Sequence, residues 1–137
     1  TLVPEAKIKQ AEMETRNGAV FFGTTASPAY EAIEILEKEG ICIDTLRIRA
    51  FPFSEEVEQF LRDHDRIFVI EQNRDGQMRR LLLNETNVSV KDRLIPILEY
   101  DGLPVTARKI AGMIRNFITL GNVTPITRRA SAQEVSA

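Results

Sequence analysis

The stretch Ile67-Phe68-Val69-Ile70, with Glu71-Gln72-Asn73 directly after it, decides the fold. Four consecutive apolar residues indicate a strand that is buried on both faces, as strands of a parallel sheet are. Ala19-Val20-Phe21-Phe22 is a second run of this kind, and it ends at Gly23-Thr24-Thr25. Each run is followed by a helical pattern, so we predict a mostly parallel sheet with helices on both faces.

The rest of the chain continues this alternation. Ser27-Pro28 predicts a helix start, with a hydroxyl N-cap and a proline at the first helical position, and Gly40 predicts its end. Pro96 lies inside the apolar run 94–98 and places that strand at a sheet edge, because proline lacks the N–H that a central strand needs. The other predicted elements are an exposed or edge strand over 7–14, a strand over 41–48, helices from Ser54 and from about Gln77, and a last helix that ends at Gly121.

Length and charge limit the possible functions. The chain has 137 residues, the size of one domain, and we predict a folded unit over 1–120 with a mobile tail over 121–137. Its net charge of -2 argues against a nucleic-acid binder. No apolar run reaches the roughly 20 residues of a membrane span. The single cysteine, Cys42, excludes an internal disulfide and predicts a cytoplasmic protein. A start at Thr1 is typical of a fragment or a processed chain.

Two polar clusters follow the buried strands and form the candidate site. Gly23-Thr24-Thr25 stands where a strand leads into a helix N-terminus, which suits an anion; the alternative is a tight turn with capping hydroxyls. Glu71-Gln72-Asn73, with Gly76 shortly after, stands at the carboxyl end of the best strand, where open α/β sheets bind ligands. The alternative for this second cluster is a set of hydrogen bonds that holds the loop.

No residues form a recognisable catalytic set or a metal site. We interpret His64 as a solvated surface histidine and Cys42 as a small buried residue within a strand. Arg79-Arg80 and Arg128-Arg129 are isolated basic pairs, explained by solvated faces or, for the second pair, by another subunit. Apolar loop residues, at 51–53 and 103–104, favour a surface that a partner covers.

Four blocks of this sequence resemble one known family. The chain is similar to the C-terminal domain of the α subunit of 2-oxoacid:ferredoxin oxidoreductases over about residues 2–118. The matching blocks are Phe21-Phe22-Gly23-Thr24-Thr25, the segment from Leu46 to Phe53, Val69-Ile70-Glu71-Gln72-Asn73-Arg74-Asp75-Gly76-Gln77, and Tyr100-Asp101-Gly102-Leu103-Pro104-Val105-Thr106.

The resemblance implies a fold like the transketolase C-terminal domain. This is a three-layer α/β/α arrangement with a five-stranded sheet in the order 1-3-2-4-5, in which strand 1 is antiparallel to the rest. The strand over 94–98 would then be strand five, at the edge. The two polar clusters would share one crevice, where the strand order reverses.

The resemblance also implies a function. These enzymes decarboxylate a 2-oxoacid on thiamine diphosphate and Mg²⁺, pass electrons through iron–sulfur clusters to ferredoxin, and form an acyl-CoA with CoA as co-substrate. The blocks look most like the 2-oxoglutarate type. This domain would bind none of the cofactors itself and would contact the rest of the α subunit and the β subunit. The resemblance is also compatible with a homo-oligomer.

Two alternatives remain at this stage. One is the equivalent domain of another thiamine enzyme, such as a transketolase or a 2-oxoacid dehydrogenase E1 β subunit. The other is a free-standing module that binds a small anion.

Overall fold

The computed structural model describes residues 6–22, 25–49, 53–71, 77–85, 92–98 and 106–120. The predicted tail over 121–137 lies outside these residues. In chain order the elements are β1 (Ala6–Lys9), β2 (Asn17–Phe22), α1 (Ala26–Lys38), β3 (Asp44–Ile48), α2 (Glu55–Arg62), β4 (Arg66–Glu71), α3 (Gln77–Glu85), β5 (Leu94–Leu98) and α4 (Ala107–Leu120).

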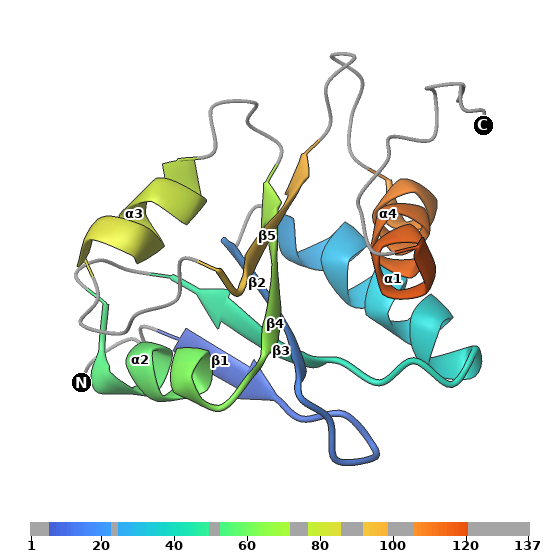
Figure 1. Cartoon of the computed structure of the whole chain (residues 1–137), viewed down its shortest axis with the longest axis horizontal. Helices are drawn as coiled ribbons and strands as arrows, with labels where there is room; N and C mark the ends of the chain where they lie inside the picture. Colours follow the sequence, from blue (N-terminus) through green and yellow to red (C-terminus); the bar gives the residue numbers. More distant parts are fainter. Residues whose placement is uncertain are drawn as a thin grey trace.

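The described strands form one five-stranded sheet in the order β1-β3-β2-β4-β5. β1 runs antiparallel to β3, and the other neighbouring strands are parallel. This confirms the predicted fold class and strand order. β5 is an edge strand, and its Pro96 lies opposite Val69 in the register. This confirms the prediction made from Pro96, because proline lacks the N–H that a central strand needs. Figure 1 shows α1 and α4 on one face of the sheet and α2 and α3 on the other.

Helix α1 begins earlier than the sequence predicted. Its N-cap is Thr25 and its first residue is Ala26, so the predictions of Ser27 as the N-cap and of Pro28 as the first helical residue are wrong. Ala26 is buried in the core, and this burial favours a helix that begins before Ser27. Pro28 lies within the first turn, where its missing N–H costs no helix bond. The helix ends as predicted at Gly40, which has a φ of 88°.

Two backbone hydrogen bonds complete that helix end. The N–H of Gly40 donates to the Glu37 carbonyl at 3.0 Å, and the N–H of Ile41 donates to the Leu36 carbonyl at 2.9 Å. This is the Schellman arrangement, and its left-handed residue is favoured as glycine.

The strand predicted over 41–48 is shorter in the structure. β3 begins at Asp44, because pairing with β2 starts at that residue, opposite Gly18. Ile43 instead packs into the core beneath α1 and α4. Cys42 therefore lies before the strand and is half-buried, which corrects its placement as a buried strand residue.

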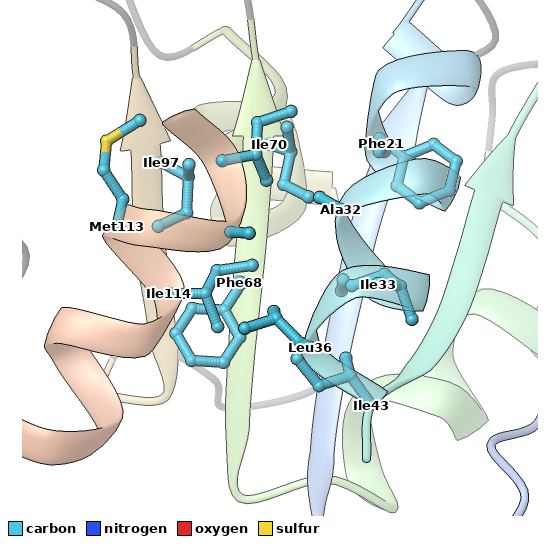
Figure 2. Packing of buried hydrophobic residues seen from close by; sticks show 14 of the residues in the cluster. Phe21, Ala32, Ile33, Leu36, Ile43, Phe68, Ile70, Ile97, Met113 and Ile114 are labelled. Carbon is cyan, nitrogen blue, oxygen red and sulfur yellow. The ribbon is translucent and has the colours of Figure 1, made fainter. Parts of the chain in front are cut away.

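Side chains of β4 alternate between two apolar cores. Phe68 and Ile70 pack with α1 and α4, as Figure 2 shows, whereas Ile67 and Val69 pack with α2 and α3. In the first core, the ring of Phe68 meets that of Phe117 edge to face, with 5.6 Å between centroids. Each face of the sheet therefore has its own apolar layer.

The α2 face depends on a close approach at Gly18 in β2. A Cβ there would lie 2.8 Å from Cε1 of Phe60 and 3.1 Å from Cγ of His64. Contacts that short force the neighbour to move. Glycine therefore lets Phe60 of α2 and His64, which follows the helix, lie directly against the strand.

Candidate functional site

The predicted crevice lies at the carboxyl edge of the sheet. β2 and β4 are adjacent and parallel, so the residues that follow them emerge at the same edge. The strand order reverses between these two strands, since the chain first adds β3 on one side of β2 and then β4 on the other. Of the predicted site residues, the structure describes Thr25 and Glu71. The remaining ones, Gly23, Thr24, Gln72, Asn73 and Gly76, lie outside the described residues.

Thr25 is buried at the start of α1. It is 4% exposed, and its side chain makes no capping hydrogen bond to the helix. The first turn of α1 contains no acidic residue. The positive end of the helix dipole is therefore not offset by a carboxylate of that turn, which is compatible with a bound anion.

Glu71 is buried at the end of β4, with 6% of its surface exposed. One carboxylate oxygen, Oε2, accepts a hydrogen bond at 3.2 Å from the backbone N–H of Arg79, the third residue of α3. An acidic side chain at this position satisfies an amide that has no partner within the helix and interacts favourably with the helix dipole. This contact agrees with the plainer interpretation of Glu71, a residue that holds the loop and helix in place.

His64 is the functional-looking residue that the sequence interpretation missed. It is 4% exposed, so its prediction as a solvated surface histidine is wrong. Nδ1 lies 2.7 Å from the Phe60 carbonyl oxygen and Nε2 lies 2.8 Å from Oδ2 of Asp44. A signal was present: residues 57, 60, 61 and 64 follow helical spacing, so His64 continues the apolar face of α2.

The arrangement around His64 is structural. The Phe60 carbonyl only accepts hydrogen bonds, so Nδ1 carries a hydrogen, and Nε2 is engaged by a carboxylate. Neither nitrogen is left to accept a proton from a substrate, as a general base must. Oδ1 of Asp44 also accepts from the Ala11 N–H at 2.7 Å, and Nη1 of Arg93 donates to the His64 carbonyl at 2.8 Å. These bonds tie four segments together at the amino edge of the sheet.

Two ion pairs shift pKa values elsewhere on the surface. The hydrogen bond from Arg16 holds the pKa of Asp65 below its usual value, against the opposing effect of desolvation. In the same way, Arg115 lowers the pKa of Glu39. Both pairs are well exposed and join segments far apart in the sequence. They contribute little individually because water and salt screen them.

The described residues contain no group of three His, Cys, Asp or Glu residues that could hold a metal ion. None of the helices in the described ranges is both long and apolar enough to cross a membrane.

No protein-family model matches the chain. It is 26% identical over 129 residues to the α subunit of 2-oxoacid:ferredoxin oxidoreductase 2 from Aeropyrum pernix. The chain is homologous to a part of this α subunit. The match covers 93% of the chain but 20% of the relative, so the chain spans about one fifth of that subunit's length.

Two solved structures have a similar fold. The α chain of a probable 2-oxoacid ferredoxin oxidoreductase from Thermoplasma acidophilum is 26% identical, with a TM-score of 0.54, over 84% of this chain and 97% of that one. The 2-oxoglutarate:ferredoxin oxidoreductase from Magnetococcus marinus, solved with 2-oxoglutarate, coenzyme A and succinyl-CoA bound, gives a TM-score of 0.72. It is 23% identical over 85% of this chain and 20% of that one, which supports the fold alone.

Proposed function

We propose that the chain is the subunit-contact domain of the α subunit of a 2-oxoacid:ferredoxin oxidoreductase, and that it contributes no catalytic group. The observation that carries this proposal is the similarity to an α subunit over 93% of the chain. The polar contacts of the described residues support it. His64 and Asp44 together join four segments at the amino edge, and Glu71 binds the start of α3, so each has a structural task.

Neither the cysteine content of the chain nor its described residues supply the ligands that the cofactors of such an enzyme need. An iron–sulfur cluster is usually held by four cysteine thiolates, and the chain has one cysteine. The described residues also offer no carboxylate group of the kind that holds Mg²⁺ at a diphosphate. We therefore assign thiamine diphosphate, Mg²⁺ and the cluster to the rest of the α subunit and to the β subunit. Ferredoxin would then be reached through the assembled complex.

We further propose 2-oxoglutarate as the substrate of the complete enzyme, with CoA as co-substrate. The four sequence blocks support this choice, since they look most like the 2-oxoglutarate type. The test is the steady-state rate of the intact enzyme with CoA and either 2-oxoglutarate or pyruvate. A higher kcat/KM with 2-oxoglutarate is expected, and a preference for pyruvate would reject the substrate without rejecting the contact role.

The contact role is tested by the substitution Glu71→Gln in the intact enzyme. We expect loss of the charged bond to the Arg79 amide to destabilise α3 locally by about 0.5–2 kcal/mol, as the loss of a helix cap does. Hydrogen exchange at that amide should therefore become faster, while kcat stays unchanged. A large fall in kcat with unchanged exchange would mean that Glu71 touches the reacting groups, and the proposal of a non-catalytic domain would be wrong.

A binding module for a small anion is the second candidate. It is favoured by one observation, the start of α1 without an acidic residue or a side-chain cap from Thr25. Calorimetry of the chain with CoA, thiamine diphosphate and 2-oxoglutarate separates the two candidates. Heat of binding from any of the three would support the module or a direct cofactor role, and no binding would support the contact domain.

A further inference from the structure

The helical layer over one face of the sheet stops short of β1. Ala6 is buried in the core beneath α2 and α3, and Ile8, two residues along, points to the same face. Ile8 is nevertheless 43% exposed. α2 is only 8 residues long and lies over the neighbouring strands. Within the described residues, part of the apolar face of this edge strand is therefore uncovered.

A groove of about 970 Å³ occupies this uncovered region. Its sides are β1, the connection 10–16 and helix α2. These elements meet at the end of the sheet where β4 and β5 begin (Figure 1). Met13, at the tip of the connection, is 70% exposed and lines the groove. Ile8 and Met13 are two of the three large apolar side chains that are well exposed in the described part of the chain. Two exposed apolar side chains at one groove are compatible with a contact surface.

The rim of this groove is acidic. Its lining includes Glu12 and Glu14 on the connection, and Glu56 and Asp63 on or next to α2. Arg16 is the single lysine or arginine among the described lining residues, and its Nη2 already lies 3.1 Å from Oδ1 of Asp65. The pKa of Arg16 is raised chiefly by that hydrogen bond, with smaller contributions from the charges of Asp63 and Glu14 among others. The groove therefore presents acidic side chains near the exposed apolar side chains of Ile8 and Met13.

The connection that forms the groove is held in place before any partner arrives. The Ala11 N–H donates to Asp44 at 2.7 Å, and the Thr15 hydroxyl donates to the Cys42 carbonyl at 2.8 Å. The Glu12 N–H donates to Glu37 at 3.1 Å. A surface that is already ordered loses little conformational entropy on binding.

We propose that this groove docks a segment of another polypeptide in which large apolar side chains are flanked by lysine or arginine. The apolar side chains would contact Ile8 and Met13, and the basic ones would meet the acidic rim. Charge decides between the possible occupants. Two copies of the chain related by a twofold axis would bring the same acidic rims together, and nucleic acid would be repelled as well. This surface is separate from the predicted crevice at the carboxyl edge. The proposal deepens the proposed contact role, on which it rests, by naming the chemistry of one partner segment.

The test is a titration of the chain with three synthetic peptides. The first alternates leucine and lysine so that it is amphipathic, the second carries glutamate in place of lysine, and the third carries serine in place of leucine. We expect the first to bind, the second not to bind, and the third to bind more weakly. NMR shifts should fall on the amide signals of residues 10–16 and α2, and binding should weaken with added salt.

Substitutions in the chain locate the binding site. Glu14→Lys together with Glu56→Lys should weaken binding of the first peptide by about tenfold, because both exposed carboxylates then repel it. Met13→Ser should weaken it as well, without unfolding the chain, because Met13 is mostly exposed. The matched control is Glu31→Lys, an exposed residue of α1 on the other face, which should change nothing.

Three results would overturn the proposal. They are equal binding of the acidic and basic peptides, no binding of the basic peptide, and an equal loss of binding in Glu31→Lys and in the groove variants. Such a failure would remove this one contact surface and leave the proposed function standing, because that function rests on the similarity to an α subunit and is tested separately at Glu71.

Discussion

The two faces of the sheet are covered in different ways. One is covered by α1 and α4, with 13 and 14 residues, over a mainly apolar core next to which the buried hydroxyl of Thr45 donates to the Lys9 carbonyl. The other is covered by α2 and α3, with 8 and 9 residues, and includes the buried polar residue His64 at its margin. Long helices close the first face by apolar packing. The shorter pair leaves β1 partly uncovered, and hydrogen bonds to His64 hold the margin together.

This difference can be tested in β4, because one buried isoleucine of that strand points to each face of the sheet. Ile70 packs under α1 and α4 with 1% of its surface exposed, and Ile67 packs under α2 and α3 with 0% exposed. Replacement of either by alanine should cost about 2–5 kcal/mol. We expect Ile70→Ala at the upper end and Ile67→Ala at the lower end, because the thinner layer can collapse into the cavity more easily.

Denaturant unfolding of the two variants measures these free energies. Ile70→Val and Ile67→Val serve as milder controls that should lose about 0.5–1.5 kcal/mol each. A larger loss for Ile67→Ala than for Ile70→Ala would contradict this comparison of the two faces.

The hydrogen bonds of His64 predict the next largest effect. His64→Leu removes both bonds and leaves Asp44 without its buried partner, so we expect a loss of about 1–3 kcal/mol. The loss should be smaller when Asp44→Asn is already present, because the charged carboxylate that loses its His64 partner is then absent. Arg62→Gln, at an exposed position of α2, should change stability by no more than about 0.5 kcal/mol.

A double-mutant cycle in urea measures this coupling, and hydrogen exchange at the Ala11 amide reports on the connection that Asp44 holds. Additive losses for His64→Leu and Asp44→Asn would show that the two side chains act independently. The margin of the α2 face would then depend on packing alone, as the other face does.

Local patterns predicted the interior of the fold well. Continuous apolar runs marked β2 and β4, and Pro96 placed β5 at the edge. The strand order came from the family resemblance, since periodicity alone does not order strands. Ends of elements were less predictable, because they depend on tertiary partners. Ala26 extends α1 by packing into the core, and the pairing of Asp44 with Gly18 sets the start of β3.

The candidate site was predictable only in part. The two strands that position it were identified, and Glu71 does lie buried at the end of β4. The start of α3 was predicted correctly, at about Gln77, but no local pattern specifies that the Glu71 side chain reaches the Arg79 amide. Burial of His64 was missed although residues 57, 60, 61 and 64 follow helical spacing, whereas its bond to Asp44, from a distant strand, has no local signal. The roles of Gln72, Asn73, Gly76 and the Gly23-Thr24 pair remain predictions.

The smallest predicted effect concerns an ion pair on the α1 and α4 face. Nε and Nη2 of Arg115 donate to the two carboxylate oxygens of Glu39 at 2.8 and 2.7 Å, which joins the last turns of α4 to the end of α1. Arg115 lowers the pKa of Glu39 from its usual 4.5. A carboxylate whose pKa is lower in the folded state stabilises the fold above its unfolded pKa, and this contribution disappears as the pH falls through the folded pKa.

Glu39→Gln should therefore lower the melting temperature slightly at neutral pH, and the difference from the unsubstituted chain should vanish below the lowered pKa of Glu39. The effect is small because both side chains are 39% exposed and salt screens the pair. Asp65→Asn, which breaks the more exposed pair with Arg16 at the amino edge, is the matched comparison and should do less. A larger effect there would mean that the margin near α2 relies on its surface charges more than the helices of the closed face do.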